Sequence, residues 1–367
     1  MAFKPQEIAE LFVGGDVYRD WESVLVKHQY GATFAWFRFT CSEGVPLAKN
    51  FAKLRIRPGD DVSIQLAGIP AIINGKVYSR QVSYSARHHH IEIQGVSFSH
   101  VLNQGSVVNK TGEWKNATWE QIARAVMAPF GVPLRIVGGL PGGLFKRIHV
   151  QPGENAAELI ERLARVKGIV LGSDGSRDLI ATSGLTAIGM DQVVEGQNIL
   201  EAREILTDNR PEGGNLAARS QLPGSDDESM TKVAHQLFQK MTPTGGVLFG
   251  TKSPALTSLT EAEVPSNMPD LSSRNDQENW ARNNDQIHLD IVVQGWLRPR
   301  GGLWIVGQQV YVWSPMLIMD QSLWLKSVTF TQDNQGGTRS TLELVNLLGQ
   351  PGSDLSPGSG GSETEST

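Results

Sequence analysis

The sequence predicts a mainly β protein with α/β insertions, in which one chain holds two similar β-barrel domains. Three observations predict this: apolar residues alternate with period two near both ends, two amphipathic helices lie between, and one pattern of strands occurs twice. With 367 residues the chain is long enough for two or more domains with their own cores. Its 39 glycines and 9 tryptophans also favour strands, tight turns and aromatic packing.

Residues 1–100 are expected to form the first β-barrel domain. Three successive strands are predicted, whose shared faces carry Val62, Ile64 and Leu66, then Tyr78, Val82 and Tyr84, then Ile91 and Ile93. The dipeptide Asn74-Gly75 lies between apolar runs, and both residues tolerate the positive φ of a type I′ turn. It therefore predicts a hairpin.

Residues 101–190 are expected to form a small α/β domain. Thr118 and Gln121 have the spacing of a capping box, and the helix that follows has an apolar stripe at Trp119, Ile122, Ala123 and Val126. A second helix is predicted to start near Asn155, with Glu158 three residues on, and to stop at Gly168. Its buried face is predicted to carry Leu159, Ile160, Leu163 and Val166. Beyond it, Asp174-Gly175 predicts another hairpin.

Residues 191–222 and 285–349 are expected to form the second β-barrel domain, beginning with strands at Ile199–Leu206 and Asn215–Gln221. Residues 223–284 are interpreted as an insertion, rich in Pro, Gly, Ser and Thr at first. Within it, Leu237–Met241 predicts a short helix and Ser273–Asn284 a surface helix. The tail 350–367 has almost no apolar residue and is expected to be disordered.

An internal repeat is the most informative feature of the sequence. Residues 58–95 and 305–346 share an order of glycine turn, apolar strand, strand with one basic residue, and short polar/aliphatic strand. The proposed equivalents are Pro58–Ile64 with Ile305–Val312, then Tyr78, Arg80, Val82 and Tyr84 with Trp324, Lys326, Val328 and Phe330, then His90–Ile93 with Thr341–Leu344. Alternation is generic, so two unrelated barrels could look similar, but the agreement in order and length favours a true repeat. Three such chains can close into a pseudo-six-fold trimeric ring.

This layout resembles the Mu-like phage baseplate central hub family, which is related to phage late-control D proteins and to the hub part of type VI secretion spike proteins. The resemblance is most specific over Ile287–Leu347, through Val292–Trp296, Gly307-Gln308, Val328–Phe330 and Thr341–Val345. Gly196–Leu200 is similar to the start of that family's second barrel, and Pro152–Glu154 with the following helix is similar to its inter-barrel module.

The resemblance implies a structural hub of a contractile phage-type tail and not an enzyme. It implies a homotrimer that joins the six-fold tail tube protein to the three-fold central spike protein, with baseplate wedge proteins at its periphery. DNA would pass through an axial channel without specific binding. The protein would be located in the virion tail baseplate after assembly in the host cytoplasm.

Charge and cysteine content exclude several other classes. The net charge is −5, and no dense run of Lys and Arg marks a nucleic-acid binder, although a mildly acidic balance suits a DNA channel. Cys41 is the single cysteine, so an intramolecular disulfide and a cysteine zinc cluster are excluded, and a buried thiol is expected. Neither a signal peptide nor a membrane-length apolar stretch is visible, so a soluble cytoplasmic product is expected.

Two groups of polar residues are candidates for a metal or a catalytic site. His88, His90 and Glu92 would share one face of a strand and could bind zinc, but the equivalent face of the second repeat has no ligand set, so a polar contact or lumen face is preferred. No catalytic, cofactor or metal residue is therefore predicted. Glu154, Glu158 and Glu161 fit the first turns of a helix.

Two rival functions stay open: a tail-tip cell-wall-degrading enzyme and a glycan-binding protein. The first would need two carboxylates that converge across a cleft. The second would need exposed tryptophans among Trp296, Trp304, Trp313 and Trp324, which strand spacing places more often in a barrel core or at a subunit contact.

Overall fold

The computed structural model describes residues 7–42, 55–85, 89–107, 112–183, 191–206, 215–221, 236–241, 257–261 and 287–346 of the chain. The fold is mostly β, as expected, with several sheets. Two of the expected features lie outside the described residues, namely the surface helix at Ser273–Asn284 and the disordered tail at 350–367.

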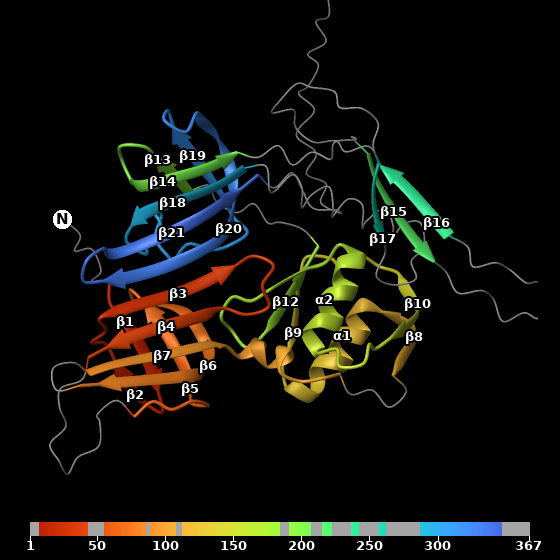
Figure 1. Ribbon diagram of the computed structural model, residues 1–367, viewed down its shortest axis with the longest axis horizontal. Helices are drawn as coiled ribbons and strands as arrows, with labels where there is room; N and C mark the ends of the chain where they lie inside the picture. Colours follow the sequence, from red (N-terminus) through yellow and green to blue (C-terminus); the bar gives the residue numbers. More distant parts are fainter. Residues whose placement is uncertain are drawn as a thin grey trace, which may run out of the picture.

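A 13-stranded sheet dominates the fold, in the order β14-β18-β21-β20-β3-β4-β7-β6-β5-β1-β2, and β19 pairs with both β20 and β13 (Figure 1). Its first half consists of β1 (Ala9–Val13), β2 (Asp16–Tyr18), β3 (Ser23–Gln29), β4 (Trp36–Cys41), β5 (Asp61–Leu66), β6 (Ile69–Tyr84) and β7 (His89–Ser97). Its second half consists of β13 (Asp191–Val194), β14 (Ile199–Leu206), β18 (Ile287–Gln294), β19 (Gln309–Ser314), β20 (Met319–Asp333) and β21 (Gly337–Val345).

The expectation of closed barrels is not met, because none of the sheets formed by the described strands closes on itself. Instead, β3 of the first half pairs antiparallel with β20 of the second, from Ser23↔Asp333 to Gln29↔Ser327. One apolar core runs through both halves and includes Phe37, Ile64 and Phe330. The edge that would have closed each barrel therefore joins the two halves into one sheet.

The two halves nevertheless repeat one strand order: β3-β4-β7-β6-β5 matches β14-β18-β21-β20-β19. At equivalent glycine turns, the Gly59 N–H donates to the Val77 carbonyl at 2.9 Å and the Gly307 N–H to the Leu325 carbonyl at 2.8 Å. The strands outside this order differ, because β1 pairs antiparallel with β5 whereas β13 pairs parallel with β19.

A β-bulge in each long strand fixes how the halves align. The register with the neighbouring strand shifts between Val77 and Ser79 in β6 and between Leu325 and Ser327 in β20. Ser79 is thus the counterpart of Ser327, and Val82 is the counterpart of Phe330. The alignment from sequence, which paired Val82 with Val328, was two residues out because period-two alternation cannot reveal a bulge.

The predicted hairpin at Asn74-Gly75 is wrong, since β6 runs through it without a turn. The turn lies earlier, at Ala67-Gly68, where both residues have positive φ. Gly75 instead sits where β6 passes from β5 to β7, and a Cβ there would lie 3.1 Å from side-chain atoms of Ile72 and Val62. The glycine therefore serves close packing between β5 and β7 and not a turn.

The prediction of which residues of β5, β6 and β7 are buried is correct for β5 and β7 but wrong for β6. Val62, Ile64, Leu66, Ile91 and Ile93 are buried as predicted. In contrast, Tyr78, Val82 and Tyr84 are 64%, 48% and 79% exposed. Their strand segment extends past the end of β5 and is covered on one side only.

A separate α/β unit follows β7, at the lower right of Figure 1, with its own apolar core. Its elements are η1 (Phe98–Asn103), β8 (Glu113–Thr118), α1 (Trp119–Met127), η2 (Ala128–Phe130), β9 (Leu134–Val137), β10 (Leu144–His149), α2 (Ala156–Lys167), β11 (Val170–Gly172) and β12 (Leu179–Thr182). Both predicted capping boxes are present, and α2 ends at Gly168 in the left-handed conformation. The predicted apolar stripes of both helices are buried.

The turn between β11 and β12, at Asp174-Gly175, attaches this unit to the first half of the sheet. The Gly175 carbonyl accepts from the backbone N–H groups of Ile73 and Asn74, at 2.8 and 3.1 Å. A Cβ at Gly175 would lie 2.4 Å from the Ala71 carbonyl oxygen, so only glycine fits this contact.

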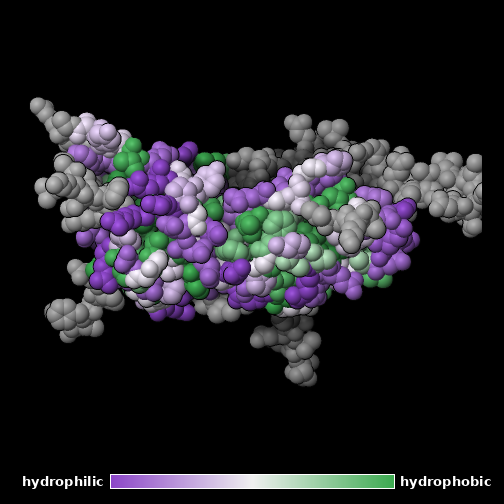
Figure 2. All heavy atoms as spheres, turned by 90° about the horizontal axis from the view of Figure 1, so that it is seen from below, coloured by the Kyte–Doolittle hydropathy of each residue, from purple (hydrophilic) through white to green (hydrophobic). Residues whose placement is uncertain are grey.

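A three-stranded sheet, β16-β15-β17, is formed by β15 (Asn215–Gln221), β16 (Gln236–Met241) and β17 (Thr257–Glu261). The predicted helix at Leu237–Met241 is therefore wrong. Five residues are too few for a stable helix, whereas pairing with β15 satisfies the backbone along the whole segment. In the described part of the chain, no helix is long and apolar enough to cross a membrane. The surface seen from below is mostly polar, with an apolar area near its middle (Figure 2).

Candidate assembly surfaces

Eight consecutive strands of the large sheet, from β14 to β6, present a polar face opposite the apolar core. Alternation along each strand produces this face: in β18 the odd-numbered Leu289 and Ile291 are buried, whereas His288 and Asp290 point the other way and are half-buried. The face is lined by Lys27, Arg38, Glu92, Gln94, Arg203, Asp290, Thr329, Thr331, Arg339, Thr341 and Glu343. We refer to these side chains as the polar face.

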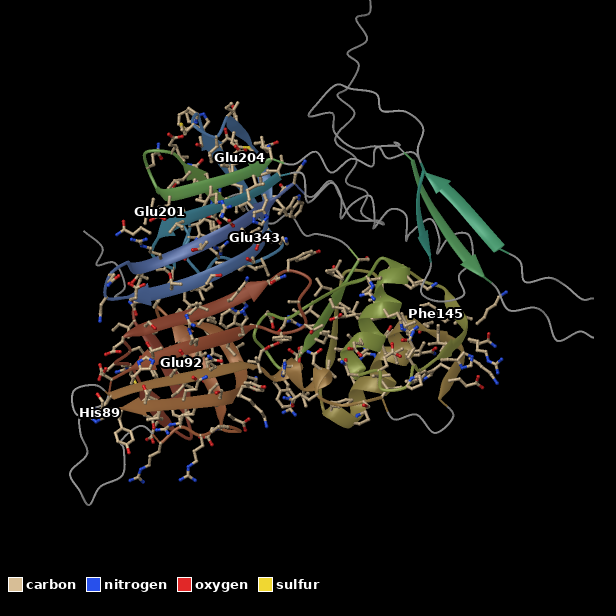
Figure 3. The ribbon with its side chains drawn as sticks, in the orientation of Figure 1. His89, Glu92, Phe145, Glu201, Glu204 and Glu343 are labelled. Carbon is tan, nitrogen blue, oxygen red and sulfur yellow. The ribbon has the colours of Figure 1, made fainter. Side chains whose placement is uncertain are left out.

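Glu343 is the centre of a charged cluster on the polar face (Figure 3). Its carboxylate lies 2.9 Å from Lys326 Nζ, 3.6 Å from His288 Nδ1 and accepts from Ser327 Oγ at 2.7 Å. Burial alone would raise the pKa of Glu343, but the hydrogen bonds from Lys326 and Ser327 outweigh burial and lower it. The cluster therefore stays ionised and internally neutralised.

Both positive and negative side chains occur over the rest of the polar face. Arg339 Nη1 lies 3.2 Å from Glu201 of β14, and Arg203 follows two residues further along the same strand. The net charge of −5 is thus not concentrated here. A surface that carries charges of both signs gives a polyanion no continuous patch to bind.

Besides β2 and β13, which also pair on one side only, two segments of the large sheet have an open edge among the described strands. β14 pairs only with β18, at one end of the sheet. In the first half of the sheet, β6 pairs with β5 only as far as Lys76, so Ser79–Tyr84 pairs only with β7. Each edge leaves backbone N–H and C=O groups available for another strand.

Apolar side chains are concentrated along both open edges. On β6 they are Tyr78, Val82 and Tyr84, and on β14 they are Leu200, Ile205 and Leu206, which are between 40% and 48% exposed. A strand edge with exposed aliphatic and aromatic residues is typical of a surface that pairs with another strand.

The hairpin between β19 and β20 forms a second exposed apolar feature. Met316 and Ile318 are 82% and 93% exposed, and Ile318 has a φ of +55°, which is unfavourable for a β-branched residue. Glu195 fixes this hairpin by accepting from Ser314 Oγ at 2.5 Å and from the Met316 N–H at 3.1 Å. These hydrogen bonds lower the pKa of Glu195.

The histidine-containing strand gives no support for a metal site. His88 lies outside the described residues, while His90 and Glu92 lie on β7, opposite Ser83 and Gln81 of β6. Among the described residues, no group of three His, Cys, Asp or Glu side chains is placed to hold a metal ion. Cys41 is buried, as expected.

The glutamates of the α2 region hold structure together. Arg162 donates to both oxygens of Glu154, from Nε at 2.7 Å and from Nη2 at 2.9 Å, and this pair is buried. Glu158 accepts from the Asn155 N–H in the capping box. Burial raises the pKa of Glu161. With Glu154 neutralised and Glu158 in a cap, this group does not form a pair of free catalytic carboxylates.

Three of the four tryptophans considered for glycan stacking are in the core. Trp296, Trp304 and Trp324 are at most 4% exposed, and Trp296 Nε1 donates to the Thr331 carbonyl at 3.1 Å. Trp313, on β19, is 41% exposed. The strand-spacing argument for core tryptophans therefore holds for three positions. These four tryptophans do not form an exposed stacking platform.

Comparison with known proteins gives one consistent result. Residues 99–183 match the second domain of baseplate hub proteins of the gp44-like kind. Over 340 residues the chain is 23% identical to the baseplate hub protein gp44 of Escherichia phage Mu, covering 90% of this chain and 86% of that protein.

Solved structures show the same fold. The 43 kDa tail protein of prophage MuSo2 from Shewanella oneidensis superposes with a TM-score of 0.77 at 23% identity, covering 93% of this chain and 98% of that one. An Escherichia coli type VI secretion component, described as similar to tail proteins gp27 and gp5 of bacteriophage T4, superposes with a TM-score of 0.57 at 10% identity, covering 92% of this chain and 76% of that one. The expected resemblance is thereby confirmed: this chain is a relative of the Mu-like phage baseplate hub proteins, and its residues 99–183 carry their second domain.

Proposed function

We propose that this protein is the structural central hub of a contractile phage-type tail baseplate, acting as a homotrimer and not as an enzyme. In this role it joins a six-fold tail tube to a three-fold central spike. Its place is the virion tail, after assembly in the host cytoplasm. The relatives named above are described as baseplate hub and tail proteins, which supports this role.

The observation that carries the proposal is the repeated four-stranded unit. The unit β3-β4-β7-β6 and the unit β14-β18-β21-β20 have the same order and lie side by side in one sheet. Three copies of the chain would supply six such units around an axis. The rim would then be nearly six-fold while the assembly is three-fold, which is what an adaptor between a hexameric tube and a trimeric spike requires.

In such a ring, the polar face would line the axial channel and the apolar core would lie outside it. Because this face carries charges of both signs, and Glu343 and Arg339 are in ion pairs, DNA could pass without specific binding. Tail tube protein and spike protein would meet opposite rims, and baseplate wedge proteins would bind the periphery.

Native mass spectrometry combined with negative-stain images of the purified chain tests the proposal. We expect a particle of about 120 kDa, three times the 40.0 kDa chain, with a central hole and a rim of six lobes. A particle with two or four copies, a solid disc, or a chain that remains monomeric at high concentration would contradict the hub assignment.

A further inference from the structure

The joint between the two halves of the chain shows how one four-stranded unit pairs with the next. Past its bulge, β20 pairs with β21 on one side and with β3 on the other. The equivalent part of β6, Ser79–Tyr84, pairs with β7 on one side, and its other side is open among the described strands. The equivalent of β3 is β14, which is likewise open on one side.

From this equivalence we infer that the segment Ser79–Tyr84 of one copy pairs antiparallel with β14 of a neighbouring copy, in the register that joins β20 to β3. The inference rests on the proposed trimeric hub and specifies its subunit contact. The ring would then contain the same strand joint six times, three times within a chain and three times between chains.

The strand pairings determine the register of this contact. Through β7 and β21, Ser83 is the counterpart of Thr331, and through β4 and β18, Arg203 is the counterpart of Leu25. Thr331 lies opposite Leu25 within the chain. Ser83 of one copy therefore lies opposite Arg203 of the next, and Val82 lies opposite Glu204.

Side-chain chemistry at the two edges fits this register. Arg80 and Val82 are on the face of β6 that corresponds to Val328 and Phe330, and Glu204 is on the matching face of β14. In the inferred register Arg80 is diagonal to Glu204, a spacing that a long side chain can bridge. The aliphatic part of Arg80 would pack on Leu206, which lies directly opposite.

Glu204 is placed for a partner from outside the chain. Its Oε1 is buried and has no hydrogen-bond partner among the described residues. Burial also raises the pKa of this carboxyl group. Figure 3 shows Glu204 and Glu201 on β14, at one end of the sheet, and His89 and Glu92 on β7, in the other half of the sheet. An arginine from a neighbouring copy would satisfy this oxygen and restore an ordinary ionised carboxylate.

Cysteine pairing tests the register directly. In the variant Ser83→Cys/Arg203→Cys, oxidation should link copies covalently into trimers, because directly opposite residues lie within disulfide range. The variant Leu25→Cys/Thr331→Cys, at the equivalent pair inside the chain, is the matched control and should form a disulfide within each chain. Ser83→Cys/Glu201→Cys, two residues out of register, should not link. The natural Cys41 is buried and does not interfere.

Charge exchange tests the proposed ion pair. Arg80→Glu and Glu204→Arg should each raise the dissociation constant of the trimer by about tenfold or more, because like charges meet across a partly buried contact. The double variant Arg80→Glu/Glu204→Arg should return most of the lost affinity.

The outcomes separate this inference from the proposed function. If the wild-type chain forms rings of three but the 83/203 pair does not cross-link while the 25/331 control does, the inferred joint is wrong and the hub proposal stands. Cross-linking of the 83/201 pair in place of 83/203 would also refute the register. If the wild-type chain stays monomeric and no pair links copies, both the joint and the hub fail.

Discussion

The two halves of the large sheet share one strand order but differ in how their edges end. In the second half, the outer part of β20 is covered by β3, and its residues Val328 and Phe330 are at most 1% exposed. In the first half, the equivalent part of β6 has an open side, and Val82 is 48% exposed. The same backbone position is therefore core in one half and surface in the other. What decides the burial of these strands is the presence of a neighbouring unit.

The halves also fill their cores differently at one equivalent pair. In the first half, Phe37 lies opposite Gly95, and a Cβ on that glycine would lie 2.2 Å from the phenylalanine ring. In the second half, the equivalent pair is Leu289 and Leu344, both buried. A large and a small residue in one half have the role of two medium residues in the other, which is the volume compensation expected of close-packed cores.

The largest difference is expected between two aspartate substitutions, one in the part of β20 that β3 covers and one in the equivalent, open part of β6. Val328→Asp should prevent folding, because Val328 is in the core. Burying an unpaired charge there costs more free energy than a protein with a total stability of about 5–15 kcal/mol can lose and stay folded. Val82→Asp, which the sequence alone would place in a core, should fold with a near-native circular dichroism spectrum and melting temperature. It should nevertheless lose trimers, because it would face Glu204 of the next copy. A Val82→Asp chain that fails to fold would contradict the open edge.

The packing difference predicts a coupled pair of substitutions. Gly95→Ala should destabilise the fold by about 1–3 kcal/mol through overpacking against Phe37 and the Lys76 carbonyl. Phe37→Leu should cost about 1 kcal/mol through lost packing. The double variant should cost less than the sum, since the smaller side chain makes room for the new methyl group. Urea unfolding of the four proteins measures this coupling, and strict additivity would refute the compensation.

The joint between the halves should be sensitive to acid through His28, which lies opposite Val328. Burial lowers the pKa of His28 from 6.5 to about 4, although the nearby Asp174 acts in the opposite direction. The unfolded chain therefore binds more protons between these values, so the free energy of unfolding should fall as pH drops from about 6.5 to 4, by at most about 3 kcal/mol.

The variant His28→Gln is the control for this pH dependence, because it keeps a hydrogen-bonding side chain and has no titration in this range. Urea unfolding at several pH values should show a smaller slope for it between pH 6.5 and 4. An identical slope in both proteins would show that the acid sensitivity lies elsewhere.

The smallest effect is expected from the hairpin turns that directly precede β6 and β20. The first uses Ala67-Gly68 at positive φ, whereas the second places Ile318 at a φ of +55°. Ile318→Asn should stabilise the isolated chain by about 1 kcal/mol, because asparagine tolerates this conformation and the isoleucine is 93% exposed. Thermal unfolding measures the effect, and a loss of stability would mean that Ile318 makes a favourable contact within the chain.

Much of the fold could be predicted because it depends on local rules. Helix caps at Thr118 and Asn155, and the alternation around Ile64 and Ile291, are fixed by side chains close together in the sequence. The errors came from long-range pairing. Nothing local shows that β3 pairs with β20, that Gly75 lies within a strand and not in a turn, or that β6 continues past the end of β5.

The sequence predicts what types of surface the protein has, but not where these surfaces lie. A repeat of three strands indicated a ring, and a polar strand face around His90 and Glu92 indicated a contact or lumen. The open edges could not be found from sequence, because Val82 and Leu206 look like core residues in an alternating pattern. Glu204 alternates with Ala202 and Leu206 along the strand, and a charge between two apolar residues of one face is a local signal of an unusual position.

Hydrogen exchange of backbone amides tests most directly the claim that one joint is filled within the chain and its equivalent is filled between chains. Peptides covering β3 and the outer part of β20 should be protected at every protein concentration. Peptides covering Ser79–Tyr84 and Ile199–Leu206 should exchange quickly in dilute, monomeric protein and become protected when the protein is concentrated enough to assemble. Equal protection of these two segments in the monomer, or fast exchange in the assembled particle, would contradict the account.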